Sequence, residues 1–216
     1  MSEVAQVLTR PRGLFGAATA LAVTGAAWGV LIVSSTMTER LGVYLGLWTL
    51  MMTAMMLPSV LPLVLLYGRS AQWNEQTLLV GAYLAVWSAT GLVAYAADMR
   101  LDVPVAPVLL LAAAYELTPL KAACLRGCRA PVDFLVLHWR RGRAGALRIG
   151  GEHALYCVGC CWALMAVLVL AASMSLVWAA VLAAVLFTQK VLPGPRWTSI
   201  GTAIALFVAA ILTEVI

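Results

Sequence analysis

A short segment around residue 157 concentrates side chains that bind soft metal ions. His153, Cys157 and Cys160 are spaced i, i+4 and i+7. On a helix this spacing places the three side chains within about 60° of one another, with Cys161 beside them. Thiolates and an imidazole aligned in this way suit Cu(I) or Zn(II), because both ions prefer sulfur and nitrogen ligands. The competing interpretation is that these cysteines pack as small apolar residues.

Four methionines form a second group of soft ligands. Met51 and Met55 are spaced i, i+4, and so are Met52 and Met56. The neutral thioether favours Cu(I), although methionine also fills gaps between packed helices. Counted from the inner ends of their predicted helices at 1.5 Å per residue, Met55 lies roughly 16 Å deep and Cys160 roughly 12 Å deep. The two groups are therefore predicted to meet if their helices touch.

A third group lies between these two in the sequence. Glu116 sits near the end of an apolar run, followed by Lys121 and by Cys124 and Cys128, which are spaced i, i+4. A carboxylate within an apolar helix indicates a functional site, while an ion pair with Lys121 or Arg126 is the alternative. Two cysteines on one helix face suit two ligands to one metal ion.

The composition places all three groups in a membrane protein. Hydrophobic residues make up 63% of the 216 residues and charged residues only 11%, whereas a soluble domain carries about 25% charged residues. Because lipid offers no partners to free backbone groups, these apolar runs predict an all-α transmembrane bundle of about seven helices. We expect a single integral membrane domain, residues 1–216. The predicted helices cover residues 14–33, 41–66, 78–97, 103–120, 153–172, 174–192 and 198–216. Only Ser173 separates the fifth from the sixth, and without that break the count is six.

The basic residues indicate an orientation. With the N-terminus inside and the C-terminus outside, all of the 14 basic residues except Arg40 and Arg100 lie on the inner side, as the positive-inside rule requires. Arg10, Arg12 and Arg196 contribute to this pattern, and so does a basic cytoplasmic loop at 121–148. Within that loop, residues 131–139 predict a surface-lying helix.

Several consequences follow from this orientation. All five cysteines lie toward the reducing side, so free thiols are expected rather than disulfides. The net charge of +5 is explained by topology and by attraction to anionic lipid, with no nucleic-acid partner. The location predicted for the chain is the inner (plasma) membrane, as a multi-pass protein.

Three motifs occur in a fixed order along the chain. They are Met-Met-x-Ala-Met-Met-x-Pro at 51–58, Thr-Pro-Leu-Lys-x-x-Cys-x-x-x-Cys-x-x-Pro at 118–131 and Cys-x-Gly-Cys-Cys-Trp-x-Leu-Met at 157–165. With these motifs the chain resembles an uncharacterised bacterial family of predicted metal-binding integral membrane proteins, over roughly residues 41–192. The resemblance implies an acidic residue before Lys190, where Gln189 stands, and an uncharged residue where Glu116 stands.

These features predict an integral membrane protein that binds a soft metal ion for delivery, storage or insertion into a membrane enzyme. The expected ion is copper, with zinc as the alternative. The predicted ligands are Cys157, Cys160, Cys161, His153, Met51, Met52, Met55, Met56, Cys124 and Cys128, with Glu116 and Lys121 as further site residues. The predicted partners are the lipid bilayer and either a membrane enzyme complex or a second copy of the chain.

Two other functions compete with metal handling. In the first, the chain is a non-catalytic structural or assembly subunit of a membrane complex, and its sulfur residues only pack. In the second, Cys157 and Cys160 perform thiol–disulfide chemistry, which a reducing compartment disfavours. No phosphate loop and no Gly-x-Ser-x-Gly elbow occurs in the sequence, so it gives no support to a hydrolase or a transferase.

Overall fold

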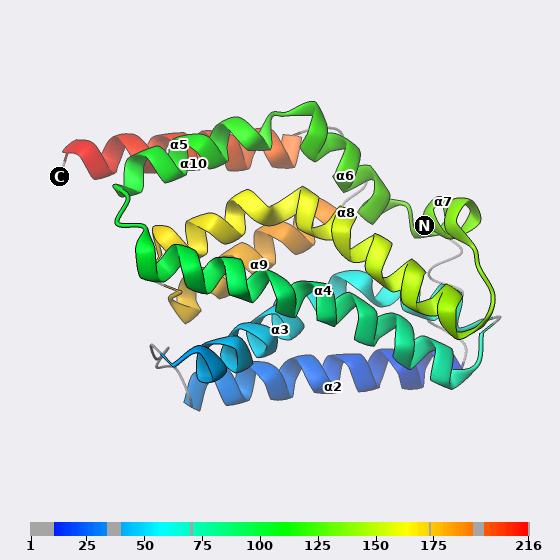
Figure 1. Cartoon of the computed structure of the whole chain (residues 1–216). Coiled ribbons are helices and arrows are strands. Elements are labelled where there is room, and N and C mark those ends of the chain that lie inside the picture. Colours follow the sequence, from blue (N-terminus) through cyan, green and yellow to red (C-terminus); the bar gives the residue numbers. More distant parts are fainter. Residues whose placement is uncertain (1–10, 34–39, 70, 173, 192–196, 216) are drawn as a thin grey trace.

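The computed structural model describes residues 11–33, 40–69, 71–172, 174–191 and 197–215, and over these residues the chain forms nine helices and no strand. The predicted all-α class is therefore confirmed. The helices are α2 (Pro11–Val33), α3 (Leu41–Tyr67), α4 (Trp73–Arg100), α5 (Val105–Glu116), α6 (Pro119–Arg129), α7 (Pro131–His138), α8 (Gly142–Leu170), α9 (Leu176–Val191) and α10 (Trp197–Val215) (Figure 1). Arg10, Ser173 and Arg196 lie outside the described residues.

Four of the described helices are long and apolar enough to cross a membrane, namely α3, α4, α8 and α10. α5 and α6 make a fifth span only if they count as one broken segment, because they meet at 65°. α9 and the apolar part of α2 are shorter. Over the described residues every predicted apolar run is largely helical, and the helix count there is nine rather than about seven. The four long helices are compatible with the predicted membrane location, while the orientation stays a prediction.

The predicted helix at 103–120 is broken in the structure for a local reason. α5 ends at Glu116 and α6 begins at Pro119. The residue before a proline is sterically disfavoured in helical conformation, and Thr118 is extended (ψ 149°). The Thr118 side chain accepts a hydrogen bond from the backbone N–H of Lys121 at 3.2 Å. Thr118 therefore caps a new helix that leaves in a new direction.

The hydrophilic segment 121–148 is mostly helical rather than an open loop. It contains most of α6, all of α7 and the first residues of α8. α7 coincides with the surface helix predicted at 131–139. On α7, Phe134 and Leu135 are buried, whereas Val136 and Leu137 are 74% and 79% exposed. Such an exposed apolar face suits a helix that lies at a membrane surface.

α8 begins well before the predicted start at residue 153. The charged residues Arg148 and Glu152 suggested a loop, but they form an i, i+4 ion pair on the more exposed side of the helix. Ala146 and Ile149 on the other side are fully buried. The first half of α8 is therefore amphipathic, which is compatible with a continuous helix.

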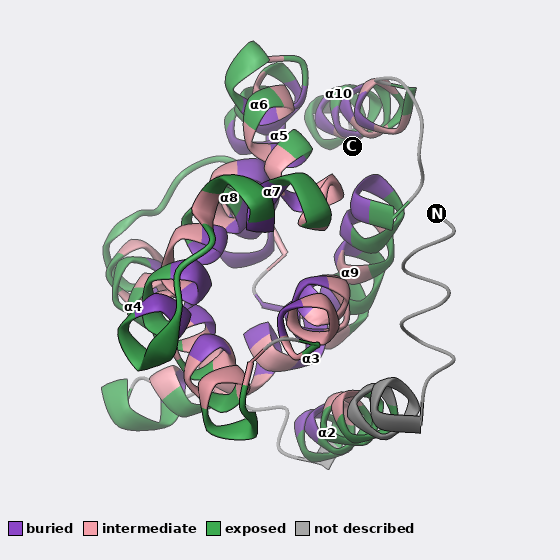
Figure 2. Cartoon of the chain, turned by 90° about the vertical axis from the view of Figure 1, so that its right-hand side faces the viewer, coloured by how far each residue is buried: buried purple, intermediate pink, exposed green. Residues whose placement is uncertain are grey.

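The core forms around α8, which packs against α4, α5, α6 and α9. Figure 2 shows the buried residues of α3 and α8 turned inward, with α2 and α10 at the edge of the bundle. At one crossing, a Cβ added to Gly150 of α8 would lie 2.2 Å from the carbonyl oxygen of Leu79 of α4. Only glycine permits this close approach of the two backbones. This close packing fixes the position of α8, the helix that carries Cys157, Cys160 and Cys161.

Candidate metal centre

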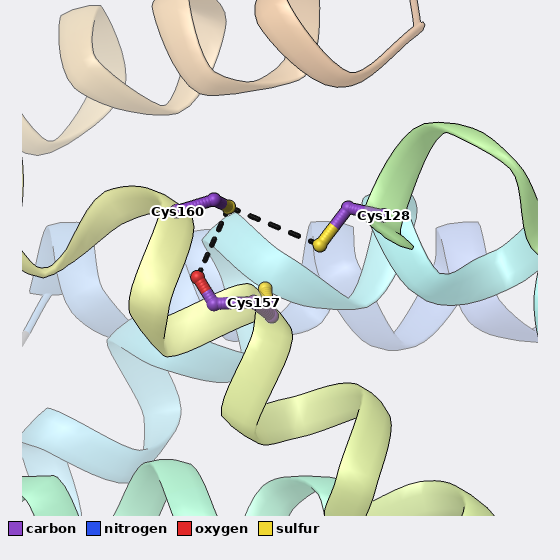
Figure 3. A group of neighbouring side chains, drawn as sticks. All are labelled: Cys128, Cys157 and Cys160. Carbon is purple, nitrogen blue, oxygen red and sulfur yellow. Dashed lines mark hydrogen bonds between the residues drawn. The ribbon is translucent and has the colours of Figure 1, made fainter. Parts of the chain in front are cut away.

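Three cysteine sulfurs converge inside the bundle. Cys157 and Cys160 come from α8 and Cys128 from α6, and their Sγ atoms all lie within 4.8 Å of one another (Figure 3). The Sγ atoms of Cys128 and Cys160 are 3.9 Å apart. All three side chains are buried. We call these three residues the sulfur cluster.

The sulfur cluster exists because α6 lies very close to α8. A Cβ added to Gly159 would meet the Cys124 sulfur at 2.7 Å, and one added to Gly127 would meet the Tyr156 ring at 2.9 Å. Each helix therefore presents a glycine to a bulkier side chain of the other. Cys128 lies one turn after Cys124 on α6, so the same approach carries its sulfur to the α8 thiols.

A buried lysine from α9 neighbours the sulfur cluster. The Lys190 ammonium donates to Cys157 Sγ at 2.9 Å, to Ser59 Oγ at 3.2 Å and to Met56 Sδ at 3.6 Å. The hydroxyl of Tyr83 is also hydrogen-bonded to Cys157 Sγ, at 3.0 Å. A buried ammonium needs nearby negative or polar partners, and here it can compensate a negative charge on sulfur.

Sequence reasoning missed Lys190, Ser59 and Tyr83 as parts of this centre. In the sequence, Lys190 counted as an inner-side charge at a helix end and as the neighbour of position 189 in the family pattern, but not as part of a metal centre. The signal that was available is a lysine within an apolar segment, since such a residue usually faces the interior and has a partner there. Ser59 and Tyr83 carried no comparable signal.

Of the other predicted sulfur ligands, Cys124 and Cys161 are not among the thiols that converge. Cys161 is buried, and its thiol donates to the carbonyl oxygen of Cys157 at 2.9 Å. Cys124 is only partly buried. Met51, Met52 and Met55 are buried in the core along α3, but Met56 is the methionine tied to the sulfur cluster, because it shares the Lys190 ammonium with Cys157.

His153, the predicted nitrogen ligand, is one turn before Cys157 on α8. It is 3% exposed, and its Nδ1 atom has no hydrogen-bond partner in the described structure. It is not among the three residues whose ligand atoms converge.

Glu116 and Lys121 form a second buried cluster with Gln189 of α9. The Lys121 ammonium pairs with Glu116 Oε1 and donates to Gln189 Oε1 at 2.9 Å, and Gln189 Nε2 donates to Glu116 Oε2 at 2.9 Å. The ion-pair interpretation of Glu116 therefore matches its surroundings. The two departures from the family pattern also meet here. The resemblance places a carboxylate at position 189. In this chain Gln189 stands there, and the carboxylate belongs instead to Glu116, to which Gln189 is hydrogen-bonded.

The chemistry of the sulfur cluster fits a soft metal ion. Thiolate ligands suit both Cu(I) and Zn(II), but structural zinc takes four ligands in a tetrahedron. Three convergent sulfurs beside a cation do not complete a zinc tetrahedron, and they require no further ligand for a three-coordinate Cu(I). Copper is thus a suitable cargo for these residues.

The comparison with known families agrees with this donor set. A family model described as PpoB2, copper chaperone, matches residues 45–213, which is most of the chain and includes every residue of the sulfur cluster. No curated protein and no solved structure matches the chain significantly.

Proposed function

The chain belongs to the PpoB2 family of copper chaperones, and from this premise we propose that it carries Cu(I) on Cys128, Cys157 and Cys160 within a membrane-embedded bundle. The observation that carries the proposal is the convergence of three buried sulfurs from two helices within 4.8 Å. Packing alone does not require thiols at these three places, since alanine or serine would occupy similar space.

A cation beside the sulfur cluster supports the binding of an anionic metal–thiolate group. Thiolate ligands around one Cu(I) leave a net negative charge, which is costly in a buried site unless it is at least partly compensated. The Lys190 ammonium, 2.9 Å from Cys157 Sγ, supplies one compensating charge. Burial also shields bound Cu(I) from water and from oxidants. The predicted orientation adds a reducing compartment that keeps the thiols available.

The proposed recipient is a copper enzyme in the same membrane, which we place in the bacterial inner membrane. Four of the described helices are long and apolar enough to cross a membrane, which supports this placement. A partner embedded in the same bilayer is therefore encountered by lateral diffusion rather than through solution.

Anaerobic titration of the purified protein with Cu(I), against a competing chelator, tests the proposal. We expect Cys128→Ser, Cys157→Ser and Cys160→Ser each to weaken Cu(I) binding by at least about tenfold, which is the loss that even outer-shell partners of a metal often cause. Cys161→Ser is the matched control, because Cys161 is equally buried on the same helix but outside the sulfur cluster. Equal losses in all four variants, or none in Cys128→Ser, would favour the assembly-subunit alternative.

A further inference from the structure

The only two histidines of the chain meet at one aromatic ring. His138 at the end of α7 stacks on Phe134, with ring centroids 4.3 Å apart and an interplanar angle of 16°. His153 of α8 contacts the same ring edge-on, with centroids 4.9 Å apart. The two imidazoles therefore lie close together although they come from different helices.

His138 presents a free lone pair toward a carboxylate. Its Nδ1 is 2.9 Å from the carbonyl oxygen of Phe134. A carbonyl oxygen only accepts, so in the neutral imidazole Nδ1 carries the proton and Nε2 keeps the lone pair. Fixing one nitrogen on a backbone carbonyl is how metal-binding histidines are commonly oriented.

The carboxylate is that of Glu152, which lies one residue before His153 on α8. His138 Nε2 is 4.0 Å from Glu152 Oε2, and the other oxygen of Glu152 accepts from Arg148 Nε at 2.6 Å. A gap of 4.0 Å is too long for a hydrogen bond and is about twice a metal–ligand bond of about 2.0–2.2 Å. Both side chains are 27% exposed, so the pair is partly open to solvent.

His153 lies between this exposed pair and the sulfur cluster. It is buried, and its Nδ1 has no partner, which is unusual because buried polar atoms are nearly always hydrogen-bonded. Its ring centroid is also 6.1 Å from that of Tyr83, whose hydroxyl is hydrogen-bonded to Cys157 Sγ. Cys157 is also the residue one helical turn after His153.

We propose that His138 and Glu152 form an entry site for copper and that His153 passes the ion inward to the sulfur cluster. This inference rests on the proposed function. The transfer is ligand exchange: copper stays Cu(I), its bond to His153 breaks as its bond to Cys157 forms, and the proton of the thiol is released to solvent. Because thiolates bind Cu(I) more strongly than imidazole or carboxylate, the ion moves toward the cysteines.

The test measures how fast copper enters and leaves. Wild-type protein and variants are mixed anaerobically with Cu(I) held by a coloured chelator, and the rate of uptake and the final copper content are followed. Release is then measured by adding excess chelator. His153→Phe keeps the ring and removes both nitrogens, and His153→Gln is a second variant in case the first does not fold. Tyr156→Phe is the control, because Tyr156 also packs on Phe134 but offers no ligand that the route uses.

We expect His153→Phe to slow uptake and release alike, each at least tenfold, with the final copper content unchanged. The double variant His138→Phe/Glu152→Gln is expected to slow both severalfold. Unchanged rates in these variants would overturn the route. A fall in copper content in His153→Phe would also overturn it and make His153 a ligand of the storage site. The variant Cys128→Ser separates failure of the route from failure of the proposed function. If the proposed function itself is wrong, Cys128→Ser retains the wild-type copper content.

Discussion

At the scale of single residues, Met56 has a different position from the other three methionines of its motif. Its sulfur and that of Cys157 both contact the Lys190 ammonium, at 3.6 Å and 2.9 Å. Met56 is thus the candidate fourth ligand among the methionines. Met51, Met52 and Met55 are buried on the same helix, and for them core packing is the competing interpretation.

The substitution Met56→Leu separates these roles. Leucine has nearly the same volume, so we expect the free energy of unfolding to change by less than about 1.5 kcal/mol. The Cu(I) affinity measured by chelator competition should fall severalfold, because a soft ligand is lost. Met51→Leu is the matched control and should leave the affinity unchanged. Equal affinities in the two variants would assign Met56 to packing as well.

Part of the metal centre could be predicted at this scale and part could not. Helix periodicity placed Cys157 and Cys160 on one face, and their sulfurs do converge. The same periodicity put His153 on that face, yet its ring packs against Phe134 of α7. His153 lies one helical turn before Cys157, and at that level of α8 the packing partner is a different helix. Cys128 rather than Cys124 joins the sulfur cluster because of the way α6 crosses α8. The spacing of the two cysteines within α6 gives no information about that crossing.

At the scale of elements, the crossing of α6 and α8 controls the sulfur cluster. Gly159 is the contact point, since an added Cβ there would lie 2.7 Å from Cys124 Sγ. Nothing lies within 4 Å of the corresponding atom at Gly151, on the same helix. The two glycines therefore offer a matched comparison between a crowded and an open position.

We predict opposite results for the two alanine substitutions. Gly159→Ala should push α6 away, lower stability by about 1–3 kcal/mol as overpacking does, and weaken Cu(I) binding by separating Cys128 from the α8 thiols. Gly151→Ala should stabilise the helix by about 0.5–1 kcal/mol and leave copper binding unchanged. Thermal unfolding in detergent and chelator competition measure both effects. Normal copper affinity in Gly159→Ala would show that the crossing does not control the centre.

The Glu116–Lys121–Gln189 cluster connects the α5–α6 corner to α9. Lys121→Met leaves a buried carboxylate without its cation, which we expect to cost about 3–5 kcal/mol. Adding Glu116→Gln removes the charge that was left and should recover most of that loss. Thermal unfolding of the two variants in detergent measures the difference. If the double variant is no more stable than Lys121→Met, the ion pair is not what stabilises this corner.

The elements themselves were largely predictable, but their ends were not. All seven apolar runs are largely helical over the described residues, and hydropathy alone was enough to locate them. The break at Thr118-Pro119 and the early start of α8 at Gly142 were not predicted. The first is set by a proline and a cap, and the second by packing of Ala146 and Ile149 beneath a charged face.

At the scale of the whole molecule, the orientation in the membrane determines which compartment the proposed entry site faces. His138 and Glu152 lie within and just after the basic segment 121–148, which the positive-inside rule places in the cytoplasm. The structure and the distribution of basic residues together predict that copper is loaded from the cytoplasmic side.

Reporter fusions in whole cells measure this orientation. A reporter active only in the cytoplasm should be active when fused after Arg141, which is exposed just before α8, and inactive when fused at the C-terminus. The reverse pattern would place the thiols toward an oxidising compartment. It would then favour thiol–disulfide chemistry over copper loading from the cytoplasm.

X-ray absorption at the copper edge of the loaded protein measures whether Cu(I) is held by the sulfurs of Cys128, Cys157 and Cys160. We predict a reduced ion whose first shell consists of sulfur neighbours. In Cys128→Ser one sulfur should be lost, whereas the shell of Cys161→Ser should match the wild type. A shell of nitrogen and oxygen neighbours, or one that Cys128→Ser leaves intact, would contradict the claim.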